Sequence, residues 1–272
     1  MIYVLFPAFN EEESIGAALA ALGSAMRGHA ESYCAVLVDD GSTDRTVAVA
    51  EKAAAELGGA LELRVLKHGV NQGLGAGLKT GIRWCLEHAR DEDVLVSLDA
   101  DNTHPPALIP GMVQLLRSGG YDLVIASRYQ RGAVIHGVPG YRRLLSDGGR
   151  FLFQALFYIP GVRDYTCCFR AYRIPVLRRA DYVYRDDWLT ARGFEAVMDL
   201  LLRLRQLGIH AAEVPIELQY EQRVGRSKMR VLHTIRRTLA LLGARFVERF
   251  GRYSRRNVQA RLSQAQAAGA RA

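Results

Sequence analysis

The chain has 272 residues, of which 49% are hydrophobic and 24% charged, and its formal net charge is +8. This length accommodates one large α/β domain or a domain with an appendage, and the apolar content is ordinary for a soluble protein. No stretch approaches the ~18 to 20 apolar residues that a membrane-spanning helix needs, and the short N-terminal apolar run lacks the basic leader of a signal peptide.

Strand and helix patterns alternate through the first half of the chain. Candidate strands occupy residues 2–6, 35–38, 63–66, 94–98, 122–126 and 214–219. Helical patterns fall near residues 13–23, 44–57, 74–88, 107–117, 142–158, 194–207 and 228–250. The alternation through residue 127 predicts an α/β fold with a mostly parallel central sheet flanked by helices. The second half is more helical, and beyond about residue 252 the composition predicts a frayed helix or disorder.

Three early strands end in polar or acidic turns, which read PAFNEE at 7–12, DDGSTD at 39–44 and DADNTHPP at 99–106. Asp99 and Asp101 are two residues apart at the end of a strand, so both carboxylates can face one spot. Two oxygen ligands at the carboxyl end of a strand suit Mg²⁺ or Mn²⁺, which takes substrate phosphate among its remaining ligands. The alternative for this segment is a polar turn that begins the next helix.

The glycine-rich segment at 73–77, GLGAG, is similar to a dinucleotide-binding loop. That fingerprint follows the first strand of its fold and is trailed about 20 residues later by an acidic residue. Here the segment opens a later helix, and the next strand ends in the aspartate pair. Close packing of this helix, near a nucleotide, is therefore the better interpretation.

Four cysteines, Cys34, Cys85, Cys167 and Cys168, show neither the spacing of a zinc site nor a disulfide framework. A reduced, cytoplasmic setting fits this pattern. For the vicinal pair at 167–168 we expect small buried fillers, and a redox site is the alternative.

Nine stretches match one family in order and spacing: PAFNEEESI, VDDGSTDRT, NQGLGAGLKTGI, DADNTHPP, SRY, RRLLS, DYTCCFRAYR, AEVPI and GRSKM. They span about residues 2 to 230. With them the chain resembles the inverting family 2 glycosyltransferases with the GT-A fold, and most closely the polyprenyl-phosphate (dolichol-phosphate) mannose synthase branch. The resemblance implies a GT-A catalytic domain over 1–222 with a helical acceptor-side C-terminal part. Residues 223–272 would then form the donor loop, a basic amphipathic helix and a basic tail.

On the donor side, the resemblance implies a nucleoside-diphosphate sugar and a divalent metal, Mg²⁺ or Mn²⁺. Asp99 and Asp101 would flank the metal, and Thr103 stands where many relatives have a glutamine. Lys228, in a loop that closes over the donor, would lie near the diphosphate. Nucleoside binding would fall to Pro7, Phe9, Glu11, Val38, Asp40 and Ala100. Phe9 replaces the usual tyrosine, so a stacking contact remains without the hydroxyl.

On the acceptor side, Arg128 follows the strand at 122–126 and could bind diphosphate or an acceptor phosphate through its forked guanidinium. The resemblance places Arg142, Arg143 and Ser146 near a lipid phosphate. For Arg170 we expect a structural ion pair with Asp164.

A phosphate acceptor needs no base, whereas a hydroxyl acceptor needs a carboxylate to take its proton. Two carboxylates on the helix at 194–207, Glu195 and Asp199, are candidates for such a base, and for each the alternative is a structural role.

We therefore expect a metal-dependent inverting hexosyltransferase that moves a sugar from GDP-mannose or a UDP-sugar to a polyprenyl phosphate. The alternatives are the same fold acting on a hydroxyl of a small molecule, glycan or lipid, and a non-catalytic sugar-nucleotide-binding module. Residues 223–272 carry a net charge of +12 and the rest −4. Such a segment could bind nucleic acid or an anionic membrane surface, or be merely solvated. No nucleic-acid motif accompanies it, and the resemblance to the polyprenyl-phosphate branch implies an anionic membrane surface, bound peripherally on the inner face of the cytoplasmic membrane.

Overall fold

The structure is a computed structural model that describes residues 1–59, 61–136, 140–219, 231–248, 250–251 and 253–267. Its strands are β1 (Ile2–Ala8), β2 (Tyr33–Asp39), β3 (Glu62–Lys67), β4 (Val94–Ser97), β5 (Leu123–Ser127), β6 (Val134–His136), β7 (Arg170–Arg173), β8 (Ala211–Pro215) and β9 (Glu217–Gln219). Its α-helices are α1 (Ile15–Met26), α2 (Thr46–Glu56), α3 (Leu74–His88), α4 (Ile109–Ser118), α5 (Gly140–Phe157), α6 (Ile174–Tyr184), α7 (Glu195–Gln206), α8 (Val231–Glu248) and α9 (Arg255–Ala267). Short 3₁₀ turns, η1 (Pro106–Leu108) and η2 (Arg185–Asp187), precede α4 and follow α6.

The main sheet has the strand order β3-β2-β1-β4-β7-β5-β8. All neighbours pair in parallel except β7, which runs antiparallel between β4 and β5. The predicted α/β fold with a mostly parallel sheet is therefore confirmed. A second, two-stranded sheet joins β6 to β9 in parallel. Because β1, β2, β4 and β5 run the same way, their carboxyl ends open on one edge, where ligands bind in such sheets.

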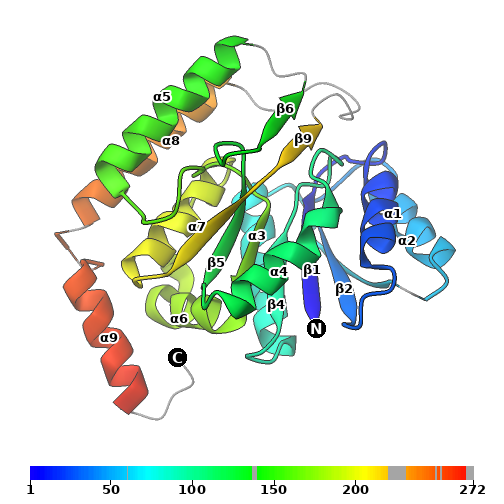
Figure 1. Cartoon of the computed structure of the whole chain (residues 1–272), viewed down its shortest axis with the longest axis horizontal. Coiled ribbons are helices and arrows are strands. Elements are labelled where there is room, and N and C mark those ends of the chain that lie inside the picture. The colour runs from blue at the N-terminus through cyan, green and yellow to red at the C-terminus, as the bar shows by residue number, and fades with distance from the viewer. Residues whose placement is uncertain (60, 137–139, 220–230, 249, 252, 268–272) are drawn as a thin grey trace.

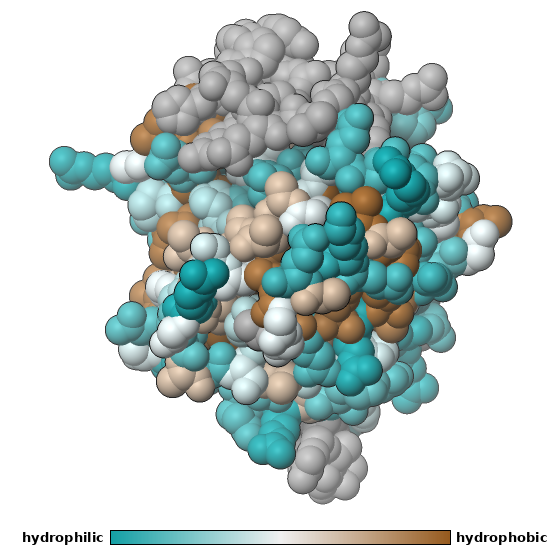
Figure 2. All heavy atoms as spheres, turned by 90° about the vertical axis from the view of Figure 1, so that its right-hand side faces the viewer, coloured by the Kyte–Doolittle hydropathy of each residue, from teal (hydrophilic) through white to brown (hydrophobic). Residues whose placement is uncertain are grey.

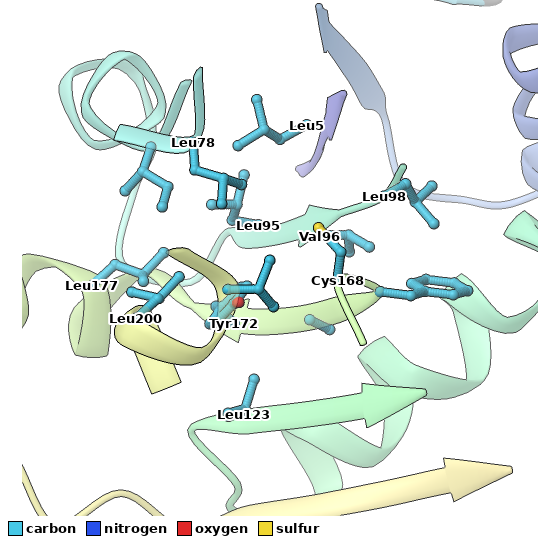
Figure 3. Packing of buried hydrophobic residues seen from close by; sticks show 14 of the residues in the cluster. Leu5, Leu78, Leu95, Val96, Leu98, Leu123, Cys168, Tyr172, Leu177 and Leu200 are labelled. Atoms are coloured by element: carbon cyan, nitrogen blue, oxygen red, sulfur yellow. The ribbon is translucent and has the colours of Figure 1, made fainter. Parts of the chain in front are cut away.

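Helices cover both faces of the sheet (Figure 1). On one face α3, α6 and α7 contact one another, while α1 packs against α2 and against η1. Figure 3 shows Leu78 of α3, Leu177 of α6 and Leu200 of α7 directed toward the strands, with Leu95 and Tyr172 among their neighbours. The strands β1, β2, β4 and β5 are almost wholly buried, which explains their apolar sequences.

Several elements differ from the sequence-based expectation: β6, β7 and α6 were not predicted, and the strand predicted at 214–219 is divided between β8 and β9, which belong to different sheets. The strand β7 reads Arg-Ala-Tyr-Arg and lacks an apolar run, yet Arg170 is fully buried and donates to the carbonyl oxygens of Val197 and Tyr165. The C-terminal residues 255–267 form the helix α9, with Val258 and Leu262 buried. Long-range hydrogen bonds and burial therefore order segments whose composition predicts neither a strand nor a packed helix.

The surface is mixed in polarity. Figure 2, which views the molecule from the side that carries α1 and α2 in Figure 1, shows hydrophilic residues interspersed with small hydrophobic groups. Among the described residues, no helix combines the length and apolar character that a membrane crossing requires.

Candidate active site

The Asp99–Asp101 turn follows β4 at the carboxyl edge of the sheet. The Asp101 Oδ1 atom accepts hydrogen bonds from the Thr103 backbone N–H at 3.2 Å and from the Thr103 hydroxyl at 2.7 Å. Asn102 has a φ of 59°, a left-handed conformation that asparagine tolerates and that reverses the chain here. Thr103 is buried and directed at Asp101, so in this arrangement it orients that carboxylate rather than adding a third side chain beside it.

His104 supports the same turn and carried no assignment from the sequence. Its Nδ1 atom accepts a hydrogen bond from the Asp99 backbone N–H at 3.3 Å, and its Nε2 atom lies 3.8 Å from Asp99 Oδ2. The Cys167 Sγ atom is 3.9 Å from the same Nε2. Both Cys167 and Cys168 are buried, and burial raises the pKa of the Cys168 thiol well above its usual value. Both thiols therefore fill space behind the aspartate turn.

The first two strands bring the expected nucleoside residues to the same edge. Pro7, Phe9 and Glu11 are partly exposed there. Val38 and Ala100 are buried, and their side chains belong to the hydrophobic core. A Cβ atom added to Gly77 would lie 3.3 Å from Pro7 Cβ and 3.9 Å from Val38 Cγ1, which shows how closely α3 approaches these strand ends.

Asp40 has a more specific environment than the sequence indicated. Its Oδ1 atom accepts from His68 Nδ1 at 2.7 Å and from the Gln72 backbone N–H at 2.9 Å, and its Oδ2 atom accepts from the Gly73 N–H at 2.7 Å. The other ring nitrogen of His68 lies 2.9 Å from the Thr80 hydroxyl on α3. The buried carboxylate thus holds the start of the glycine-rich segment, and a histidine 28 residues away in sequence supports it.

The glycines at 73–77 serve close packing, as the sequence interpretation proposed. Gly73 has a φ of 95°, and the Gly75 N–H donates to the Arg192 carbonyl oxygen at 3.1 Å. A Cβ atom on Gly75 would lie 1.7 Å from the Ala191 carbonyl oxygen. The loop before α7 therefore rests directly on the N-terminus of α3, which requires glycine at this contact.

Arg128, after β5, forms an ion pair with Asp164. Its Nε atom donates to Asp164 Oδ2 and its Nη2 atom to Oδ1, each at 2.8 Å. Burial works against both charges, but their mutual attraction and hydrogen bonds outweigh it, lowering the pKa of Asp164 and raising that of Arg128. The expected pairing of Asp164 with Arg170 is therefore wrong. Arg170 instead bonds backbone carbonyl groups within the core.

The expected acceptor residues Arg142, Arg143 and Ser146 lie on α5, which the structure places as a helix from Gly140 to Phe157. Their side chains, and the whole of Lys228, lie outside the described residues. The assignments of these four residues therefore stay predictions.

The two candidate bases face α8. Asp199 is fully buried, and Arg245 donates from Nε to its Oδ1 at 2.7 Å and from Nη2 to its Oδ2 at 2.9 Å. Glu195 is buried as well, paired with Arg237 at 2.7 Å and accepting the Gly193 N–H at 3.0 Å. This geometry favours a structural role for both carboxylates, which lock α8 onto α7.

Comparisons with known proteins agree with the resemblance. The model of the family "Glycosyl transferase family 2" matches residues 3–181. An undecaprenyl-phosphate mannosyltransferase of Micrococcus luteus is 35% identical over 228 residues, covering 84% of this chain and 87% of that protein. A polyprenol monophosphomannose synthase of Mycolicibacterium smegmatis is 32% identical over 226 residues, covering 83% of this chain and 80% of that protein.

Solved structures show the same fold. A glucosyl-3-phosphoglycerate synthase from Mycobacterium tuberculosis, crystallised with Mn²⁺, UDP-glucose and phosphoglyceric acid, superposes with a TM-score of 0.64 at 22% identity, covering 90% of this chain and 79% of that one. This likeness concerns the fold. The matched family model and the two relatives above 30% identity go further: the chain belongs to glycosyl transferase family 2, with the GT-A fold that its sequence motifs predicted.

Proposed function

We propose that the protein transfers mannose from a nucleoside-diphosphate donor to a polyprenyl phosphate, with inversion at the anomeric carbon. The observation that carries this proposal is the meeting of Asp99, Asp101, Asp40 and Arg128 at one edge of the sheet, together with the mannosyltransferase relatives. An α-linked donor would then give a β-linked product, since a single in-line displacement inverts the centre.

The aspartate turn fits a divalent cation. Asp99 is 35% exposed in its side chain, and Asp101 is held in place by Thr103. One or two carboxylates, with water and substrate phosphates as the other ligands, are the usual protein contribution to a Mg²⁺ site. Among the described residues no larger cluster of acidic, histidine or cysteine ligands occurs. When bound, the cation would stabilise the negative charge that develops on the leaving diphosphate.

The buried ion pairs of Glu195 and Asp199 favour a phosphate acceptor over a hydroxyl acceptor. A phosphate monoester is already anionic at neutral pH and can attack the anomeric carbon unaided. A hydroxyl would need a general base within hydrogen-bond reach, and both candidates are held by arginines of α8. The residues of this chain therefore have to bind and orient the donor and the acceptor, and to exclude water from them.

Exposed apolar side chains support a position at the membrane surface. On α5, Phe151 is 63% exposed, and on and after α8, Val247 and Phe250 are 71% and 82% exposed. Figure 1 places α5 and α8 on the side of the molecule opposite α1 and α2. The inner side of α8 packs on the body, since Leu241 and Leu242 are buried. Exposed aromatic groups next to a basic segment suit reversible binding to anionic lipid.

The decisive experiment incubates the pure protein with labelled GDP-mannose and UDP-sugars, with and without polyprenyl phosphate, and identifies products by mass. The proposal requires a mannosyl-lipid product that EDTA abolishes. An Asp101→Ala variant should lose transfer while keeping its thermal unfolding temperature. Transfer at the wild-type rate in EDTA would overturn the metal assignment, and transfer only to hydroxyl compounds would overturn the acceptor.

Membrane binding is tested separately, by co-sedimentation with anionic and neutral liposomes at low and high salt. Binding to anionic liposomes that weakens with salt is expected, because each basic group near such a surface contributes about 1 kcal/mol. Equal binding to both liposomes, or to neither, would contradict the membrane assignment.

A further inference from the structure

Three arginines surround Tyr129, the residue that follows Arg128. The Arg128 guanidinium carbon lies 5.8 Å from the centre of the Tyr129 ring, and that of Arg150 lies 4.8 Å from it. Arg163 Nη1 donates to the Tyr129 carbonyl oxygen at 3.5 Å. Three segments distant in sequence thus bring positive charge to one place beside the carboxyl end of β5.

The charges of Arg128 and Arg150 are compensated very differently. Arg128 forms the bidentate pair with the buried Asp164. Arg150, in contrast, has no carboxylate within ion-pair distance among the described side chains, and its buried Nε atom has no hydrogen-bond partner there. Because this Nε atom is enclosed by the protein, the donors of Arg150 that a ligand could reach are its terminal Nη atoms, which are not among the enclosed atoms. The charges without a carboxylate partner here, among the described side chains, are therefore those of Arg150 and of the exposed Arg163, and of these two only Arg150 lies on α5.

The position of Arg150 on α5 points to the acceptor. Residues 142, 146 and 150 are spaced at i, i+4 and i+8, so Arg150 shares a helix face with the predicted phosphate-binding residues Arg142 and Ser146. Its guanidinium also lies 5.0 Å from the ring of Phe151, which is exposed. Stacking on aromatic rings orients a guanidinium while leaving its N–H edge free for a forked contact with phosphate.

We propose that Arg150 binds the phosphate group of the acceptor and selects a phosphate monoester over the corresponding alcohol. This inference rests on the proposed function, since it names a further residue of the same acceptor site. Arg128 is held by its bidentate pair with Asp164, and Arg150 adds a positive charge that the phosphate neutralises. Phe151, next in sequence, would lie where the first isoprene units leave the phosphate.

The test compares Arg150→Ala and Arg150→Lys with wild type, using a short-chain polyprenyl phosphate as acceptor and the matching prenol as the neutral probe. Arg27→Ala, which removes one exposed arginine at the end of α1, is the matched control for net charge. We expect Arg150→Ala to raise the acceptor KM about 10- to 100-fold, the loss of one charge-assisted bond, without changing the donor KM. The lysine variant should recover part of this loss.

Binding is measured directly as well, by titrating the short-chain polyprenyl phosphate into each variant without donor. Wild type should bind the phosphate more tightly than the prenol, and this preference should fall about 10- to 100-fold in Arg150→Ala, the same factor as for the acceptor KM. If the wild type is active and Arg150→Ala has an unchanged acceptor KM, the role of Arg150 is overturned while the proposed function stands. A wild type that makes no lipid product would overturn the proposed function, and this inference with it.

Asp147 provides a further check, because it lies three residues before Arg150 and its side chain is outside the described residues. If Arg150 were committed to this carboxylate, Asp147→Ala and Arg150→Ala would lower the unfolding temperature equally and leave acceptor binding unchanged. That result would overturn the assignment. Loss of acceptor binding in Arg150→Ala alone supports it.

Discussion

The sharpest test of the site concerns Asp199, because two roles for this carboxylate predict opposite results. If Asp199 is a structural partner of Arg245, Asp199→Asn removes the negative charge from a fully buried bidentate pair. Breaking such a pair costs about 3–5 kcal/mol, because the buried Arg245 then keeps, among the described residues, a single carboxylate contact, to the partly exposed Glu248 at 2.7 Å. In a protein of this size that corresponds to a fall of about 6–20 °C in the unfolding temperature.

If Asp199 is instead a general base, Asp199→Asn should lower kcat about 10²- to 10⁴-fold and leave the stability unchanged. The assay is therefore thermal unfolding together with kcat at saturating donor and acceptor, below the unfolding temperature of the variant. We expect a large loss of stability and a kcat within a few-fold of wild type. The double variant Asp199→Leu/Arg245→Met, which replaces both charges with apolar groups, should recover much of the stability. Unchanged stability with a hundred-fold loss of kcat would refute this reasoning.

Three further predictions follow from the site. Asp164→Asn should unfold more easily than wild type at pH 7, and denaturant titrations at pH 7, 5 and 3 should show this difference shrinking below about pH 4. The reason is that the folded carboxyl has a lowered pKa, so its contribution is lost once the unfolded aspartate, with a pKa of about 3.9, takes up a proton. His68→Ala should raise the donor KM several-fold with little change in kcat, because Asp40 loses its histidine support; a change in the acceptor KM alone would contradict this. Gly75→Ala should lower the unfolding temperature, since its Cβ would lie 1.7 Å from a carbonyl oxygen, whereas the open site at Gly111 should accept alanine at no cost in stability.

The sequence by itself determined the chain order of β1 to β5 and of the helices α1 to α4 between them, together with the chemistry of the strand ends. Nearly continuous apolar runs such as residues 94–98 can be recognised in the sequence because a strand buried on both faces admits few polar side chains; here the single exception, Ser97, donates to the Cys168 carbonyl oxygen. The helix predicted at 74–88 has the bounds of α3. The turn residues after these strands are local features, so the aspartate pair and the glycine-rich segment are recognisable without a structure.

Only the tertiary structure decided how the charged groups are paired. Residue types at 128, 164 and 170 allow either arginine to neutralise Asp164, and the choice depends on the antiparallel insertion of β7 between β4 and β5. In the same way, Asp199 becomes a buried partner because α8 packs on α7 and brings Arg245, 46 residues later in the sequence, to this carboxylate. The sequence states which ionisable group stands at each position, but the burial and the partner of that group are set by contacts between segments that are remote along the chain.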